Sequence, residues 1–559
     1  MPRSMVVSLQ PDAVEAGANV LRAGGNAVDA ALALAFVQTV VDPMMCGIAG
    51  FGSMHLFLPR KGVHEIIDFH GRVPAAATPE MWQDRILGET EDGFGFILED
   101  AVNDIGYQSI TTPGTLKAFW QAHQRFGSRP WPALLESAIR YASDGYVVTP
   151  GVYGYWTGAG LPGRVSVRDR LGFCADGRQV YFDPDGQVMP IGSIVRNPGL
   201  AQTYERLAAD GADVFYTGDI ARQIDSDMQR NDGLLNARDL ADYATESHEP
   251  LWGDYRGLKV ATNHPPGGGI MVIEMLNILE RFDLVAMGHN SSDYIRTVAE
   301  AMKIATADKD NHVGDPRFVE VPVERLISKD YAIQQAAAIS RGEKAHVERL
   351  GLSESPGTTH LCVSDSAGNI VSMTHSLGMM SGVITPGLGF MYNGCMGVFD
   401  PRPGRAGSIA PGKSRFSSIC PTILFDGDRP ILTLGAPGAT QIAMGVLQTI
   451  LNVVDFGMTP QEAVLAPRFS ATSDAITVTA RIPRYSYAEL EDAGYRFIRS
   501  ASSYDIASVH AIGFDRDGEP AGGADIVYGA GMALKVTDST RTVKRFFRGC
   551  AADCAESCR

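Results

Sequence analysis

The order of apolar and polar residues divides the chain into a helix-rich part followed by a strand-rich part. Residues 11–23 have helical periodicity and end at a glycine pair, and Asn26 then caps a second, strongly apolar helix. Several further helical segments occupy residues 113–350. After Thr358 the pattern changes to short alternating runs separated by turn residues, which is typical of antiparallel strands and hairpins. We therefore expect an α-rich region before about residue 350 and a β-rich region after it.

The first alternating runs after this change predict their own register. A turn cluster, DSAGN, separates them, so the segment is expected to be a hairpin. If Ser364 pairs with Ile370, counting outward places Thr358 opposite Ser376. Thr358, Thr374 and Ser376 then project from one face of the sheet. Hydroxyl side chains are common in strands for reasons of β-propensity, so a chemical role for these three needs further signals.

Size and charge limit the classes of protein that the chain can belong to. With 559 residues, it exceeds the size of a single hydrophobic core, so two domains or one large many-layered fold are expected. The net charge of -16 argues against a nucleic-acid partner, because phosphates would be repelled. We find no apolar run long enough for a membrane span and no secretory signal at the N-terminus. The expected location is therefore cytoplasmic, or periplasmic if the N-terminus is truncated.

The cysteine pattern favours reduced thiols over a disulfide framework. Five of the 8 cysteines are scattered, with no C-x-x-C pair: Cys46, Cys174, Cys362, Cys395 and Cys420. The other three, Cys550, Cys554 and Cys558, have helical spacing at the C-terminus and could bind a metal as thiolates. No fourth ligand is visible, so a loose tail is the favoured interpretation. No metal site and no cofactor are expected.

Residues 407–414, GSIAPGKS, match the phosphate-binding loop pattern G-x-x-x-x-G-K-[ST]. Such a loop needs a buried strand before it and a helix that begins at its lysine. Two prolines precede the match, and Pro421 would fall inside the required helix, where proline costs about 3 kcal/mol. We therefore interpret the segment as a surface loop leading to a strand, and nucleotide binding is the disfavoured alternative.

Thr358 is a candidate nucleophile because of the residue before it. The sequence has no G-x-S-x-G turn, no H-E-x-x-H zinc helix and no obvious triad partner for a serine or cysteine. One remaining arrangement makes Thr358 the first residue of a new chain, so that its own α-amine serves as the base. Gly357 suits such a cut, because glycine permits a strained backbone and the threonine hydroxyl could attack the preceding carbonyl.

Six stretches, in order along the chain, carry a resemblance to a known family. They are AGANVLRAGGNAVDAALALAF, PPGGGIMVIEMLNILERFDL, AMKIATADKDNHVGDPRF, GTTHLCVSDSAGNIVSMTHS, RFSSICPTILF and LGAPGATQIAMGVLQTILNVVDFGMTPQEAVLAPRF. On these stretches the chain resembles the γ-glutamyltransferase family of N-terminal-nucleophile hydrolases. The resemblance implies an α+β fold, a four-layer αββα sandwich. It also implies self-cleavage between Gly357 and Thr358 into a large chain, 1–357, and a small chain, 358–559.

The resemblance assigns catalytic roles to four residues. Thr358 would be the nucleophile and, through its freed amine, the base. Ser376 stands in place of a family threonine that hydrogen-bonds the nucleophile, and it keeps the hydroxyl. Gly438 and Ala439 would supply the paired backbone N–H groups of the oxyanion hole. An alanine at the second position still supplies its N–H if its φ is allowed.

Substrate binding is where the sequence departs from the family pattern. Ser417 and Ser418 match two serines that contact the substrate carboxylate, with a turn before a strand as the structural alternative. The family's carboxylate-binding arginine is replaced by His70, and Arg72 could substitute for it. Thr374 completes the predicted substrate-binding set.

The three polar partners of the substrate α-amine are also absent. Their positions carry Gly378, Cys395 and Val398, and Cys395 is expected to be a buried thiol that fills space. The resemblance implies hydrolysis or transfer of γ-glutamyl amides through a threonyl ester. One alternative is an amidase for a carboxylated acyl group without an α-amine, of the oxamyl or glutaryl type. Another is a catalytically idle binding protein. The expected partners are a small-molecule amide and a large–small heterodimer, which could pair further into a dimer.

Overall fold

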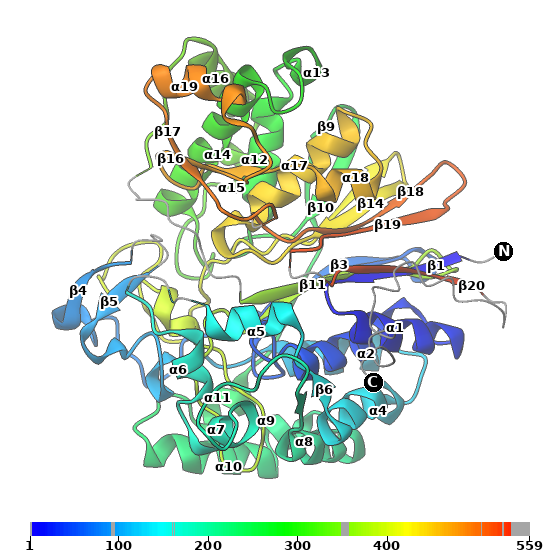
Figure 1. The fold of residues 1–559 in the computed structure, drawn as a ribbon, viewed down its shortest axis with the longest axis vertical. Coiled ribbons are helices and arrows are strands. Elements are labelled where there is room, and N and C mark those ends of the chain that lie inside the picture. Colours follow the sequence, from blue (N-terminus) through cyan, green and yellow to red (C-terminus); the bar gives the residue numbers. More distant parts are fainter. Residues whose placement is uncertain are drawn as a thin grey trace, which may run out of the picture.

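Two antiparallel sheets pack face to face, and each is covered on its outer side by helices (Figure 1). This computed structural model describes residues 3–90, 95–158, 160, 163–347, 357–504, 506–527 and 530–537. The layer order is the predicted αββα sandwich. Among the described residues, no helix combines the length and the hydropathy that crossing a membrane requires.

Both sheets mix strands from the two predicted chains. The seven-stranded sheet has the order β20 (Met532–Thr537), β1 (Arg3–Ser8), β11 (Thr358–Ser364), β12 (Ile370–Ser376), β2 (Phe51–Leu58), β3 (Val63–Asp68), β8 (Glu246–His248). The six-stranded sheet has the order β19 (Pro520–Ala524), β18 (His510–Phe514), β14 (Arg429–Gly435), β13 (Thr422–Asp426), β10 (Leu258–Thr262), β9 (Leu251–Tyr255). The predicted division into a helical and a strand region is therefore only partly right, because six strands of these two sheets come from before residue 350.

The helices on the seven-stranded sheet explain the first apolar segment. α2 (Ala27–Val41) is buried along its whole length, so it shows no polar face in the sequence. Asn26 caps it, and the capping box is closed by Asp29. Around it lie α1 (Pro11–Arg22), α3 (Thr115–Phe126), α4 (Trp131–Asp144) and α8 (Pro198–Asp210). These helices bury the outer face of the sheet that carries Thr358.

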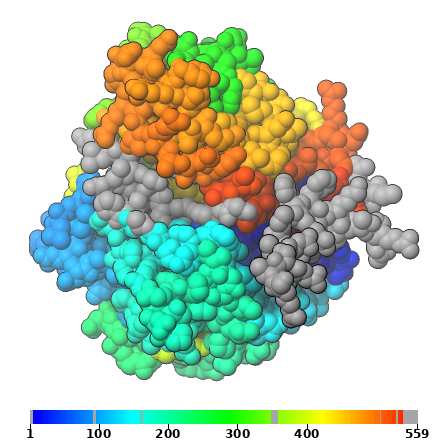
Figure 2. All heavy atoms as spheres, viewed as in Figure 1, coloured from blue at the N-terminus to red at the C-terminus, as the bar shows by residue number. Residues whose placement is uncertain are grey.

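A second helical layer covers the six-stranded sheet. It contains α12 (Gly269–Leu279), α14 (Ser292–His312), α16 (Lys329–Ser340), α17 (Ile442–Val454) and α18 (Pro460–Leu465). Smaller elements of this half are α13 (Leu284–Met287), α15 (Val323–Leu326), α19 (Ala488–Asp492), β15 (Phe469–Ser470), β16 (Ala475–Val478) and β17 (Arg496–Arg499). In the space-filling view this half forms the upper part of the molecule (Figure 2).

The remaining short elements lie in the other half, with the helices below the sheets and the β4–β5 pair at the left in Figure 1. They are α5 (Pro150–Thr157), α6 (Val167–Leu171), α7 (Ala175–Tyr181), α9 (Asp213–Tyr216), α10 (Asp219–Arg230) and α11 (Ala237–Asp242), with the strand pairs β4 (Ile86–Glu89) and β5 (Phe96–Leu98), and β6 (Tyr146–Val147) and β7 (Ile194–Val195).

The predicted hairpin register is confirmed. Ser364 pairs with Ile370, and Thr358 pairs with Ser376 at the other end of β11 and β12. The Asp365 carboxylate closes the turn by accepting hydrogen bonds from the N–H groups of Ala367 and Asn369, at 2.9 and 3.1 Å. The hairpin lies in the middle of the seven-stranded sheet, between β1 and β2, so its position is fixed from both sides.

The segment 407–414 is a loop, as predicted. No helix follows it, and the chain continues without regular structure to β13. The Lys413 ammonium donates to the carbonyl groups of Ala406 and Ser408, at 2.7 and 2.9 Å. The lysine therefore stabilises its own loop rather than presenting a charge to a phosphate.

Candidate active site

Thr358 lies at the start of β11 and shares a hydrogen bond with Ser376. The two hydroxyl oxygens are 2.8 Å apart, and Thr358 is 5 % exposed. The Ser376 hydroxyl donates to the Gly357 carbonyl and accepts the Gly378 N–H at 2.7 Å. A serine hydroxyl has one proton, so the proton between the two side chains belongs to Thr358. Ser376 therefore accepts the hydrogen bond that holds the nucleophile in place while it donates to the carbonyl that precedes Thr358.

Gly357 is held where only a glycine fits. A Cβ added there would lie 2.0 Å from the carbonyl oxygen of Gly378, far inside contact distance. The backbone of β11 therefore passes very close to the loop after β12. This close approach brings the Gly357 carbonyl to Ser376.

Gly438 and Ala439 adopt unusual backbone conformations next to the same cavity. Gly438 has φ +142°, and Ala439 has φ +48°, in the left-handed region. For a residue with a side chain this region costs about 1–2 kcal/mol. Strain of this kind persists only where the surrounding structure enforces it, and it is frequent at active sites. Ala439 lines the cavity of Thr358, which agrees with the predicted oxyanion role without testing it.

The cavity at Thr358, named here the nucleophile cavity, combines hydroxyl groups, apolar walls and one charge. It is lined by Phe51, Gly357, Thr358, Ser376, Gly378, Met379, Arg415, Ser417, Ser418, Ile419, Ala439 and Ile442. Both predicted serines, Ser417 and Ser418, are among these residues. Within the described part of the chain, no lining side chain carries a carboxylate.

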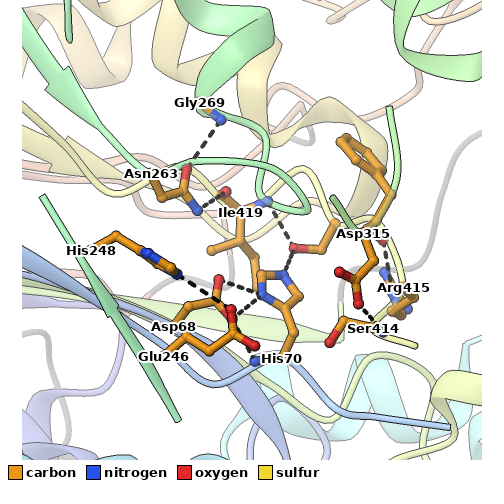
Figure 3. A network of polar contacts seen from close by, with 12 residues as sticks. Asp68, His70, Glu246, His248, Asn263, Gly269, Asp315, Ser414, Arg415 and Ile419 are labelled. Atoms are coloured by element: carbon orange, nitrogen blue, oxygen red, sulfur yellow. Dashed lines mark hydrogen bonds and ion pairs between the residues drawn. The ribbon is translucent and has the colours of Figure 1, made fainter. Parts of the chain in front are cut away.

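His70 connects this cavity to a second one, because it lines the second cavity and contacts Ser417, which lines the first. Figure 3 shows His70 beside Asp68. The Nε2 atom of this histidine is 2.7 Å from the Ser417 hydroxyl, and its Nδ1 is 2.8 Å from the Asp68 carboxylate. The carboxylate fixes the proton on Nδ1, so in the neutral ring Nε2 accepts the serine O–H. Asp68 also accepts the His70 backbone N–H at 3.0 Å. In the sequence, His70 was noted only as the residue that replaces the family's carboxylate-binding arginine. In the structure it is the residue that orients Ser417.

Arg72 is not among the residues that line the nucleophile cavity. Its guanidinium pairs with Glu246 at 2.8 Å and lies over the ring of Tyr243. It lines a neighbouring cavity of about 320 Å³, named here the charged cavity, whose walls carry Asp68, His70, Arg72, Tyr243, Glu246, His248, His264, Asp315, Arg317 and Ser414. The proposed substitution of Arg72 for the carboxylate clamp is therefore not supported by this geometry.

Glu246 is the centre of the charged cavity. The hydrogen bond from His248, together with the positive charges of Arg317 and Arg72, outweighs the opposing effect of burial and lowers the pKa of Glu246 to about 2. In return the carboxylate raises the pKa of His248 above its ordinary value. Arg72 is therefore already occupied by a carboxylate of the protein.

Thr374 contacts a histidine rather than the nucleophile cavity. Its hydroxyl lies 2.8 Å from Nδ1 of His360, and both side chains are completely buried in the sandwich. Burial holds the pKa of His360 well below its usual range, so the ring is neutral. The predicted substrate contact of Thr374 is not supported by this arrangement.

The sequence reasoning missed Arg415. It precedes Ser417 by two residues, lines the nucleophile cavity and is 5 % exposed. Burial lowers the pKa of its guanidinium from the ordinary value. An arginine beside a serine pair was the only signal in the sequence, and its contact with the ring of Phe51 joins residues far apart along the chain.

The positions of the absent α-amine partners lie beside this arginine. A Cβ at Gly378 would be 3.0 Å from the Cys395 sulfur and 3.4 Å from an Arg415 nitrogen. Cys395 is buried, and burial raises the pKa of its thiol to about 11, so it is a neutral filler. Val398 ends the same short 3-10 turn, Cys395–Val398.

No metal centre is evident in the described part of the chain. In that part, no group of three or more His, Cys, Asp and Glu side chains is arranged so that it could hold a metal ion. Its five cysteines are all free thiols. The predicted alternative of a metal at Cys550, Cys554 and Cys558 lies outside the described residues.

Comparison with known proteins gives the same family along most of the chain. The gamma-glutamyltranspeptidase family model matches residues 13–534. The acylase ACY 1 proenzyme of Pseudomonas sp. strain SE83 is 38% identical over 531 residues, which cover 93% of this chain and 92% of the relative. The glutathione hydrolase proenzyme of Bacillus subtilis strain 168 is 32% identical over 540 residues, covering 92% and 88%. The crystal structure of cephalosporin acylase from Bacillus halodurans superimposes with a TM-score of 0.84 at 30% identity, over 95% of this chain and 96% of that one.

Proposed function

The chain belongs to the gamma-glutamyltranspeptidase family, and on that premise we propose that it is a self-cleaving threonine amidohydrolase. The observation that supports this most directly is the chain of contacts from Thr358 through Ser376 to the Gly357 carbonyl. An idle relative would have no physical need for this arrangement. The word proenzyme in the names of two relatives agrees with a large and a small chain made from one precursor.

Maturation would begin with attack of the Thr358 hydroxyl oxygen on the Gly357 carbonyl carbon. The C–N bond between the two residues breaks, the nitrogen takes a proton, and an ester joins Gly357 to the threonine oxygen. Water then opens the ester, which leaves a carboxylate on Gly357 and a free α-amine on Thr358. The products are the chains 1–357 and 358–559, which stay joined because both sheets contain strands of each.

Turnover would use the same oxygen on an external amide. The freed amine of Thr358 takes the hydroxyl proton while the oxygen attacks the substrate carbonyl, and the N–H groups of Gly438 and Ala439 stabilise the oxyanion. The amine product leaves with the proton, and water hydrolyses the acyl ester to release the acid and restore Thr358. An acceptor amine in place of water would give transfer. Ser376 would hold the nucleophile, and Ser417 and Ser418 would bind the acyl carboxylate.

Two acyl groups are compatible with this site. The first is γ-glutamyl, in agreement with the glutathione hydrolase relative. The second is a carboxylated acyl group without an α-amine, in agreement with the acylase relative. The second is favoured by the absence of polar side chains at Gly378, Cys395 and Val398, because an ammonium would lose charge-assisted hydrogen bonds worth about 1.5–3 kcal/mol each. Assembly of two heterodimers into a larger dimer belongs to the same proposal.

Intact mass of the purified protein beside Thr358→Ala tests the proposal. We expect two fragments that correspond to 1–357 and 358–559 in the wild type and one uncut chain in the variant. Thr358→Ser is the matched control, because it keeps the hydroxyl and should still be cut. A cut Thr358→Ala chain, or an uncut wild type, would mean that Thr358 is not a self-processing nucleophile.

A further inference from the structure

Arg415 places a fixed positive charge in the wall of the nucleophile cavity. Its guanidinium lies over the ring of Phe51, 5.1 Å from the ring centroid, and its Nε donates to the Phe416 carbonyl at 3.0 Å. Figure 3 shows the side chain beside the network that joins His70 to Ile419. Two contacts on different sides hold the guanidinium in one orientation. The charge is therefore part of the rigid wall rather than a surface group that can move away.

This charge lies close to the nucleophile. Thr358 shares its hydrogen bond with Ser376, and Ser376 accepts the N–H of Gly378. A Cβ added to Gly378 would stand 3.4 Å from Nη1 of Arg415. The guanidinium therefore occupies the side of residue 378 toward which a longer side chain would project. Gly378, which lies beside the guanidinium, is hydrogen-bonded directly to Ser376, the hydrogen-bond partner of Thr358.

The other lining groups make the charge decisive for binding. Among the described residues that line the cavity, Arg415 carries the only charge. Phe51, Met379, Ile419 and Ile442 supply apolar surface, and such walls reduce the screening of a nearby charge. A guanidinium in this setting binds a carboxylate through paired N–H donors and repels an ammonium. The two serine hydroxyls add neutral donors for the same anion.

We infer that Arg415 is the specificity-determining residue of the acyl pocket: it binds a terminal carboxylate of the acyl group and excludes acyl groups that carry an ammonium there. The substrate class is then an amide of a dicarboxylic acid, such as a glutaryl amide. Water would convert it into the dicarboxylate and a free amine through the Thr358 ester. The inference rests on the proposed function, since it concerns the same cavity and the same nucleophile.

Three anilides test the inference by changing one group at a time. Glutaryl p-nitroanilide and γ-glutamyl p-nitroanilide differ only by the α-ammonium. Pentanoyl p-nitroanilide replaces the terminal carboxylate of the glutaryl compound by a methyl group. We expect kcat/KM of the mature wild type to favour the glutaryl compound over each of the others by about 10- to 100-fold.

Variants of Arg415 then assign the preference to this residue. Arg415→Met should lower the glutaryl to γ-glutamyl ratio at least about 10-fold, while Arg415→Lys should keep part of the preference for a carboxylate, because it keeps the charge but not the paired donors. Arg317→Gln is the matched control, because Arg317 lines the charged cavity and should leave the ratio unchanged within about 2-fold. Ratios measured on one preparation do not depend on the folded fraction, and intact mass reports how much of each variant is cut.

The outcomes separate this inference from the proposed function. An uncut wild type would overturn the self-processing mechanism itself. A cut wild type that prefers γ-glutamyl, or an Arg415→Met variant with an unchanged ratio, would overturn the role of Arg415 alone. A cut wild type that hydrolyses none of the three anilides would also count against the substrate class. If Arg415→Met is not cut, calorimetry of free glutarate and glutamate binding to the uncut Arg415→Met and to the uncut Thr358→Ala decides the same point, because only the second keeps the guanidinium.

Discussion

Two cavities meet at the hydrogen bond between His70 and Ser417, and they differ in how their charged lining side chains are paired. In the charged cavity each cation lies against a carboxylate: Arg317 is 2.5 Å from Asp315, and Arg72 is 2.8 Å from Glu246. In the nucleophile cavity the described lining residues include one guanidinium, that of Arg415, and no carboxylate. The two spaces are neighbours, yet the cations of one lie against carboxylates of the protein, whereas the described lining of the other contains no carboxylate.

The pairing of the charges determines which cavity can recognise a charged ligand. An ion pair within the protein must be separated before either member can bind an incoming group, and the separation opposes binding. Arg72 is therefore poorly placed to serve as a carboxylate clamp, although it has the right chemistry. The nucleophile cavity has no carboxylate among its described lining residues, and its reacting oxygen is already in place.

The largest effect is expected at Gly357, where the nucleophile cavity has no room for an added atom. Gly357→Ala would place its Cβ 2.0 Å from the Gly378 carbonyl oxygen, so the carbonyl before Thr358 must move. A displacement of about 1 Å can cost about 10²-fold in rate, and we expect self-cleavage to slow by at least that factor. A time course of intact mass after expression measures it.

The control for Gly357 is a glycine in open space. Gly154 lies in α5, and an added Cβ there would meet nothing within 4 Å. Gly154→Ala should be cut at the wild-type rate. Rapid maturation of Gly357→Ala would show that the close approach to Gly378 is not needed for the reaction.

The hairpin shows how far the sequence alone could lead to this site. Period-two alternation and a turn cluster fix which residue lies opposite which, so Thr358 and Ser376 could be paired before any coordinates. The same reasoning could not place Arg72. Its backbone bridges to Thr112 and Ser414, which turns its side chain toward Glu246, and no local pattern encodes contacts across such sequence distances.

The role of Arg415 could not be predicted from the sequence for the same physical reason. It depends on the positions of Phe51 and Gly378, which belong to other parts of the fold, and on burial that a loop sequence does not reveal. The layer order could be anticipated from the family resemblance. The exchange of strands between the two predicted chains could not be read from the change of pattern near residue 350, because pattern reports local structure and not pairing partners.

A smaller effect is expected where the two cavities join. His70→Ala removes the hydrogen bond that orients Ser417, and a lost bond of this kind costs about 1–1.5 kcal/mol. We expect KM for a carboxylated anilide to rise about 10-fold while kcat changes little, because the lost contact serves binding rather than the reacting oxygen. Steady-state kinetics on the mature enzyme separate the two constants.

Two variants sharpen the test of His70. His70→Gln keeps a polar group that can reach Ser417 and should recover most of the affinity. His264→Ala is the matched control, since His264 also lines the charged cavity but bonds the Glu249 carbonyl instead, and its KM should stay within about 2-fold. A fall in kcat equal to the change in kcat/KM would instead assign Ser417 and His70 to the chemical step.

The smallest effect concerns stability, and it belongs to the charged cavity alone. Since the pKa of Glu246 falls from its ordinary value of 4.5 to about 2 on folding, its stabilising contribution is complete above about pH 4.5 and disappears as the pH falls toward 2. The raised pKa of His248 adds a contribution that is complete below about pH 6.5 and disappears as the pH rises through the folded value. Glu246→Gln should therefore lower Tm most between about pH 4.5 and 6.5.

The Glu246 side chain is 35% exposed, so solvent screening limits the loss of stability to about 1 kcal/mol or less, a shift in Tm of roughly 1 °C. Thermal unfolding followed across this pH range measures the difference, with Glu205→Gln on the exposed surface of α8 as the control that should show none. A Tm difference that grew below pH 4.5 would mean that the charged cavity is not neutralised in the way its ion pairs indicate.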